Sequence, residues 1–181
     1  MNIRAFLEHV YEGKKRKTGA KASSHPIAVR KILVDEGIKE EAILNAALLH
    51  DVLEDTSITK EYLRLRFGDK VAELVDLVSK LSSWNTSYCK MKGSLDDMEQ
   101  AWSVHPESVL IKMADRLHNL QTIHGFSPEK QNEYIDETND MLLPLFERII
   151  KNNRLSYLQK SLLSLYDRLE KETRKASNHH R

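Results

Sequence analysis

The sequence predicts an all-α protein, a single domain built as a bundle of roughly eight to ten helices. Apolar residues recur at helical spacing along most of the chain, and no segment shows the apolar–polar alternation of a strand. Only 6 glycines and 4 prolines interrupt the 181 residues, of which 40% are hydrophobic. A chain of this length and composition can bury one substantial core.

In the first half of the chain, the predicted helices have recognisable starts and ends. The helix that begins at His25 carries a proline in its first turn, where proline is tolerated, and ends at Gly37. The helix after it is apolar through most of its second half, which is typical of a buried central helix. These helices cover residues 2–13, 25–37, 39–55, 59–68 and 69–83, with a basic connector at 14–24.

The second half continues in the same way after an irregular segment, 84–94, which we expect to be a loop. Pro144 is expected to kink the long helix that contains it. No shift in composition marks an internal boundary, so we expect one domain over residues 1–175 and a frayed polar tail over residues 176–181. The helices predicted here cover residues 95–105, 106–125, 127–152 and 155–174.

Charge and cysteine content restrict the classes of function. The 28 basic and 27 acidic residues leave almost no net charge, which argues against a general nucleic-acid binder. Cys89 is the only cysteine, which excludes an intramolecular disulfide and fits a reducing cytosol. No apolar run has the length of a membrane span or the character of a signal peptide. We therefore expect a cytoplasmic protein that uses neither nucleic acid nor a membrane as partner, and its oligomeric state stays open.

One apolar helix carries an unusual set of polar side chains. In "NAALLHDVLEDT", His50 lies one turn before Glu54, and Asp51 lies one turn before Asp55, so each pair shares a face of the predicted helix. Burying carboxylates costs several kcal/mol unless a cation compensates. The alternative interpretation is a solvated helix end at which the acids face water.

Two further residues favour a bound cation over a solvated helix end. His25 precedes Pro26 at a helix start, and Asp115 lies in the apolar helix "VLIKMADRLHNL". Taken alone, His25 could be a polar N-terminal residue and Asp115 the partner of Arg116. Two imidazoles and two carboxylates drawn from three helices suit a divalent transition metal such as Mn²⁺, Fe²⁺ or Zn²⁺. This predicted metal site consists of His25, His50, Asp51 and Asp115.

Several motifs resemble the HD hydrolase domain of Rel/SpoT proteins, and most closely its free-standing form, the small alarmone hydrolases. They cover nearly the whole chain in the family's order, and the "HDxxED" pattern is narrower than a bare His-Asp pair. The motifs are "HPIAV" at 25–29, "ALLHDVLEDT" at 47–56, "FGDKVAELVDLVSKL" at 67–81, "VLIKMADRLHNL" at 109–120 and "SPEKQNEYIDET" at 127–138.

The resemblance implies an HD-type helical bundle that hydrolyses (p)ppGpp, the alarmone of the stringent response, at its 3′ position. The products are GDP or GTP and pyrophosphate, with (p)ppApp as an additional or alternative substrate. The four residues of the predicted metal site match the family's metal ligands, for which Mn²⁺ is the usual ion. Glu54 and Asp55 match the acidic pair that activates and orients the attacking water. The positions that match substrate-binding residues are Arg16, Lys17, Thr18, Asn119 and Thr122.

The chain also departs from the family. Lys21 and Ala22 stand where a Pro-Tyr pair is usual, so the preference between guanine and adenine stays open. We expect His118 to pack or to face solvent rather than to approach the metal. The length leaves no room for the synthetase and regulatory domains of the long Rel proteins, so we expect hydrolysis without synthesis. Whether Lys80, Trp84 or Tyr88 contacts substrate is also open.

Two alternative functions follow from the same residues. One is an HD-family phosphatase that releases orthophosphate from NADPH or a nucleotide. The other is a catalytically silent module that binds the alarmone. The intact pair Glu54 and Asp55 argues against the silent module, because a binding protein has little use for residues that activate water.

Overall fold

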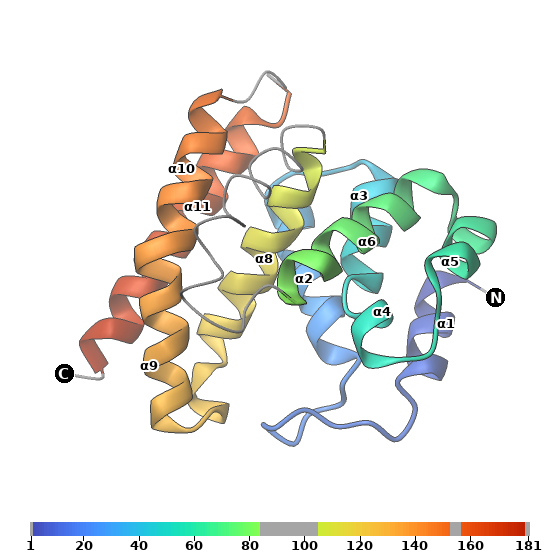
Figure 1. The fold of residues 1–181 in the computed structure, drawn as a ribbon, viewed down its shortest axis with the longest axis horizontal. Helices are drawn as coiled ribbons and strands as arrows, with labels where there is room; N and C mark the ends of the chain where they lie inside the picture. The colour runs from blue at the N-terminus through green and yellow to red at the C-terminus, as the bar shows by residue number, and fades with distance from the viewer. Residues whose placement is uncertain (1, 84–104, 153–156, 180–181) are drawn as a thin grey trace.

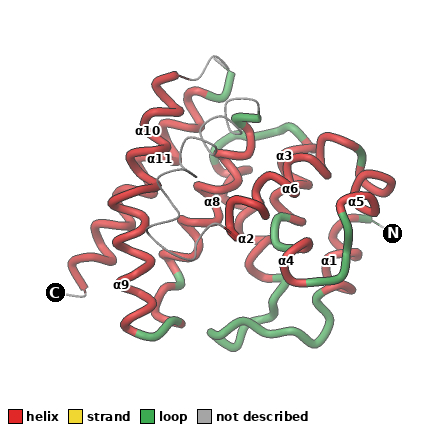
Figure 2. Tube along the Cα trace, in the orientation of Figure 1, coloured by secondary structure: helices red, strands yellow, loops and turns green. Residues whose placement is uncertain are grey.

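The chain folds as helices joined by turns and loops (Figures 1 and 2). The computed structural model describes residues 2–83, 105–152 and 157–179, with only the backbone described for 80–83. Within these ranges, the one pairing of extended residues is an isolated bridge between Lys15 and Lys21. The predicted all-α fold is therefore confirmed.

The helices that the structure describes agree closely with the predicted ones. A short 3₁₀ turn, Ile123–Gly125, follows α8, and a π-helical segment, Thr138–Leu142, separates α9 from α10. The α-helices are α1 (Ile3–Val10), α2 (Ser24–Asp35), α3 (Glu41–Leu49), α4 (Val52–Asp55), α5 (Lys60–Phe67), α6 (Asp69–Ser83), α8 (Glu107–Gln121), α9 (Pro128–Glu137), α10 (Leu143–Asn152) and α11 (Gln159–His179).

Some predictions lie outside the described residues. These are the loop 84–94, nearly all of the helix 95–105, the residues Trp84 and Tyr88, and the side chain of Lys80.

Helix starts follow the capping rules that the sequence contains. Asn2, Thr59 and Ser127 each precede a helix, and each side chain accepts a hydrogen bond from a backbone N–H in the first turn. Gly68 separates α5 from α6 with a φ of 91°, a conformation that is costly for any residue with a Cβ atom. Side-chain caps and the conformation of one glycine therefore determine these helix boundaries.

The predicted helix 39–55 is in fact two helices, and this difference matters for the site. α3 ends at Leu49, α4 begins at Val52, and His50 and Asp51 form the junction. The amides of Glu54 and Asp55 both donate to the carbonyl of Asp51, which restarts the helix after the junction. Both junction residues keep dihedral angles in the helical region.

Two other boundaries differ from the prediction. In place of a simple kink at Pro144, the chain forms the π-helical segment, in which the Leu143 N–H donates to the Thr138 carbonyl five residues earlier. The last helix extends to His179, so most of the predicted frayed tail is helical. The tail residues continue a helix whose apolar side packs on α8 and α9, and polar composition alone did not reveal this.

Helix α8 lies at the centre of the bundle (Figure 1). Every residue from Glu107 to Leu117 is buried, and α8 packs against α2, α3, α6 and α11. One hydrophobic core extends from α1 to α11, which agrees with a single domain. Because α8 contacts both α2 and α3, it can bring a side chain to the junction at His50. No described helix is long and apolar enough to cross a membrane.

Candidate metal centre

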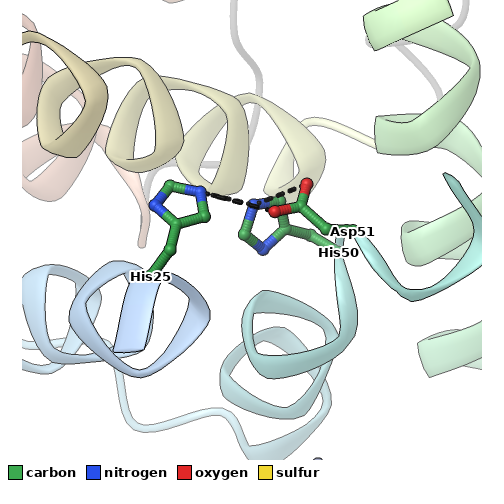
Figure 3. Close-up of side chains that lie close together, drawn as sticks. All are labelled: His25, His50 and Asp51. Carbon is green, nitrogen blue, oxygen red and sulfur yellow. Dashed lines mark hydrogen bonds and ion pairs between the residues drawn. The ribbon is translucent and has the colours of Figure 1, made fainter. Parts of the chain in front are cut away.

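His25, His50 and Asp51 converge from two places in the chain (Figure 3). His25 lies in the first turn of α2, and the other two form the junction between α3 and α4. The Nε2 atoms of the two imidazoles are 3.2 Å apart, and His50 Nε2 is 3.1 Å from Asp51 Oδ1. Both histidines are buried, while Asp51 is partly exposed. The cluster therefore opens to solvent on the Asp51 side.

Asp115 approaches the same two imidazoles from α8. Its Oδ1 atom is 3.1 Å from His25 Nε2 and 3.8 Å from His50 Nε2. Its other oxygen accepts a hydrogen bond from Lys112 at 3.1 Å, and both of these side chains are buried. Burial alone would raise the pKa of Asp115, but Lys112 and the two imidazoles hold it well below its usual range. The carboxylate is thus ionised, with one oxygen toward the histidines.

The chemistry of this donor set fits a divalent metal. His50 Nδ1 lies 2.8 Å from the carbonyl oxygen of Ala47 and donates to it, which leaves a lone pair on Nε2. In the neutral ring that lone pair faces a second imidazole and two carboxylates, so the position favours a positive charge, which is either a second proton on Nε2 or a metal ion bound to it. Burial alone would lower the pKa of His50, but Asp51 and Asp115 raise it to about 9. The site therefore attracts a cation, and nitrogen and oxygen donors of this mixture suit Mn²⁺, Fe²⁺ or Zn²⁺.

Glu54 and Asp55 lie on α4, next to the cluster, and both are exposed. The carboxylate of Asp55 accepts a hydrogen bond of 3.1 Å from the hydroxyl of Tyr11, and its backbone carbonyl accepts one of 2.8 Å from Lys14 Nζ. Burial, Asp51 and Asp55 together raise the pKa of Tyr11 well above its ordinary value. Asp55 is therefore held by Tyr11, which directly follows α1, and by Lys14 of the basic connector.

Arg16 and Asn119, two of the predicted substrate-binding residues, lie next to the cluster. The Nη2 atom of Arg16 donates to Asn119 Oδ1 at 3.1 Å, and Asn119 Nδ2 donates to Asp115 Oδ1 at 2.7 Å. A cationic side chain of the basic connector is therefore linked, through one amide, to a predicted metal ligand.

The other predicted substrate residues surround the C-terminal end of α8. Lys17 Nζ lies 5.7 Å from the centre of the Phe126 ring. A Cβ atom on Gly125 would lie 2.5 Å from Thr18 Cγ2, so glycine allows the connector to approach closely here. The hydroxyl of Thr122 donates to the carbonyl of His118 at 3.0 Å.

His118 packs, as predicted, and the residue that it packs against is His25. Its Nδ1 atom is 2.7 Å from His25 Nδ1 and 3.3 Å from Arg16 Nη1. It therefore contacts the predicted ligand His25 at the ring nitrogen that does not face the cluster. Burial, the neighbouring His25 ring and the Arg16 guanidinium lower the pKa of His118 to about 4, which keeps the ring neutral. Residues three apart share a helix face, so its position three residues after Asp115 is the feature of the sequence that allows His118 to approach the cluster.

Arg116 does not pair with Asp115. Its guanidinium donates to Glu137 at 3.0 Å and lies 3.8 Å from the centre of the Tyr134 ring, toward α9. The alternative account of Asp115, as the partner of its neighbour in sequence, is therefore not what the structure shows.

The fold and the site together define a class: all-helical proteins in which a His-Asp doublet meets a second histidine and a second aspartate from other helices. A family model described as "HD domain" matches residues 4–149, and the chain belongs to that family.

Named relatives point to hyperphosphorylated guanosine nucleotides. A Synechocystis sp. protein named probable guanosine-3′,5′-bis(diphosphate) 3′-pyrophosphohydrolase is 38% identical over 146 residues, which are 80% of this chain and 19% of that protein. A Streptomyces coelicolor protein named GTP pyrophosphokinase is 39% identical over 145 residues, or 80% of this chain and 17% of that protein. The chain therefore spans less than a fifth of either relative.

A solved structure matches the chain nearly end to end. It is described with the words "A metazoan ortholog of SpoT hydrolyzes ppGpp and plays a role in starvation responses". It shares 25% sequence identity with a TM-score of 0.62, and the match covers 91% of this chain and 92% of that one.

Proposed function

We propose that the chain is a metal-dependent hydrolase that removes pyrophosphate from the 3′ position of (p)ppGpp. The observation that carries this proposal is the convergence of His25, His50, Asp51 and Asp115 beside an acidic pair on α4. The names of the relatives and the words describing the solved structure support the choice of substrate, because each refers to this nucleotide or its synthesis.

The reaction is the attack of water on the phosphorus atom that is bonded to the ribose 3′ oxygen. That P–O bond breaks, the 3′ oxygen is protonated, and pyrophosphate leaves. A divalent cation held by the four ligands supplies positive charge that favours ionisation of water and stabilises the phosphoryl oxygens. Mn²⁺ is the ion we propose.

Glu54 is the proposed general base. Its side chain is exposed on α4, at the open side of the cluster, where a water molecule and a substrate can reach it. Asp55 is proposed to orient this region, because its carboxylate is already engaged by Tyr11 and its carbonyl by Lys14.

The basic connector is the proposed phosphate-binding segment. Arg16 already lies against α8, and its planar guanidinium suits phosphate oxygens. Exposed lysines at positions 14, 15, 17 and 21 add positive charge around it. Asn119, Thr18 and Thr122 complete the proposed substrate site at the end of α8.

We further propose that the HD domain extends over residues 1–175, and that the protein is cytoplasmic.

The test is product identification with the purified protein and Mn²⁺. We expect ppGpp to yield GDP and pyrophosphate in equal amounts, with ppApp assayed in parallel to determine base preference. Release of orthophosphate alone, from ppGpp or from NADPH, would replace this proposal with the phosphatase. Tight binding of ppGpp without any turnover would instead identify a silent binding module.

A further inference from the structure

The Nδ1 atom of His118 lies between two potential partners. It is 3.3 Å from Arg16 Nη1 and 2.7 Å from His25 Nδ1. A guanidinium nitrogen can donate a hydrogen bond but cannot accept one. His118 Nδ1 must therefore act as an acceptor toward Arg16, which requires that this nitrogen carries no proton.

This requirement determines the protonation of the neighbouring ring. Since His118 Nδ1 carries no proton, the short contact to His25 is a hydrogen bond only if His25 Nδ1 is the donor. A neutral His25 with its proton on Nδ1 has its lone pair on Nε2. That is the atom 3.2 Å from His50 Nε2 and 3.1 Å from Asp115 Oδ1.

The two histidines of the cluster are thus oriented by different kinds of acceptor. His50 donates to a backbone carbonyl, which no substitution of a side chain can remove. His25 donates to a side chain on another helix, 93 positions away in the sequence. The second of these interactions can be tested by mutation.

We propose that His118 is a positioning residue that holds His25 with its Nε2 lone pair toward the metal. This inference rests on the proposed metal centre. A partner that orients a metal-bound imidazole typically contributes about 10–100-fold to metal affinity. His118 also connects His25 to Arg16, whose other arm reaches Asp115 through Asn119. The Arg16 guanidinium is therefore linked to two proposed metal ligands, one through His118 and the other through Asn119.

The first experiment measures Mn²⁺ affinity from the electron paramagnetic resonance signal of the free ion, with no substrate present. His118→Leu removes the acceptor, and we expect the Kd for Mn²⁺ to rise about 10–100-fold. His118→Asn places a side-chain oxygen near the position of Nδ1, and we expect it to restore most of the affinity. His9→Leu, which removes an exposed imidazole from α1, is the matched control and should leave the Kd unchanged.

The second experiment uses NMR to determine which tautomer His25 adopts. In ¹⁵N-labelled protein loaded with Zn²⁺, two-bond ¹H–¹⁵N correlations should show His25 with a protonated Nδ1. In His118→Leu this pattern should be lost or mixed, and in His118→Asn it should return. Circular dichroism confirms that each variant keeps its helices.

The outcomes separate the two proposals. If the unsubstituted protein binds no Mn²⁺, the metal centre itself is wrong. If it binds Mn²⁺ and His118→Leu binds equally well, only the role of His118 is overturned. A His25 that carries its proton on Nε2 in the Zn²⁺-loaded protein would overturn it too, as would a His118→Asn variant as weak as His118→Leu.

Discussion

At position 54, metal binding and turnover can be separated by a single substitution. Glu54 lies on α4, beyond the junction that carries the proposed ligands His50 and Asp51, so its proposed role as general base does not require that it hold the metal. Glu54→Gln keeps the shape of the side chain and removes its basicity. We expect kcat for pyrophosphate release to fall at least about 100-fold while the Kd for Mn²⁺ stays the same.

The control for this prediction is Glu61→Gln, which neutralises an exposed glutamate in the first turn of α5. It should change neither quantity. Full activity in Glu54→Gln would show that another group takes the proton from water.

We expect Tyr11 to make the stability of the protein depend on pH in the alkaline range. Its hydroxyl donates to Asp55, and burial together with Asp51 and Asp55 raises its pKa above the ordinary value near 10. A raised pKa in the folded state means that the stabilisation is complete below pH 10. It is lost as the pH rises further, because the unfolded chain releases the phenol proton first.

Urea unfolding at pH 7 and at pH 10.5 tests this prediction. Tyr11→Phe should destabilise the protein by about 1 kcal/mol at pH 7, since it removes one hydrogen bond. The variant should also lose less stability than the parent between the two pH values. An identical loss in both proteins would show that Tyr11 does not contribute to the alkaline transition.

At the scale of elements, the contact between the connector and the end of α8 can be tested with a pair of substitutions. A methyl group on Gly125 would lie 2.5 Å from Thr18 Cγ2, so Gly125→Ala forces the connector away from α8. We expect this displacement to cost about 1 kcal/mol of substrate binding, which raises KM for ppGpp roughly fivefold. Mn²⁺ affinity should not change, because Gly125 lies beyond the helix that carries Asp115.

The second substitution makes this test specific. Thr18→Ser removes the methyl group that would clash but keeps the hydroxyl. The double variant Gly125→Ala, Thr18→Ser should therefore recover most of the lost affinity for substrate. If the double variant is as weak as Gly125→Ala alone, the contact between these two positions is not the cause.

Helix boundaries show which parts of the fold the sequence could predict. Caps and glycines act over a few residues, so the ends of α2 and α5 followed from the sequence. The junction at His50 and Asp51 did not, because both residues have dihedral angles in the helical region and the apolar pattern runs across them. Its cause lies in tertiary contacts, which position these two side chains toward α2 and α8.

Over the whole molecule, the sequence predicted those parts of the candidate site whose chemical role follows from residue type and spacing. Histidines and aspartates in apolar helices indicated four candidate ligands, and the structure brings these four side chains close together. Tyr11 was not found, and the contact of His118 with His25 was not foreseen, because these hydrogen bonds join residues 44 and 93 positions apart. Only packing brings such pairs together, and each side chain alone has an ordinary alternative role.

Metal binding should stabilise the entire bundle, because the four ligands come from α2, from the α3–α4 junction and from the central helix α8. A metal at 100 times its Kd adds about 2.7 kcal/mol to the free energy of unfolding. For a domain of this size, that corresponds to a rise in Tm of roughly 5–10 °C. Differential scanning calorimetry with and without Mn²⁺ measures this shift, and a chelator should reverse it. In His50→Ala both the shift and the activity should disappear together, whereas a variant that kept the full shift would exclude His50 as a ligand.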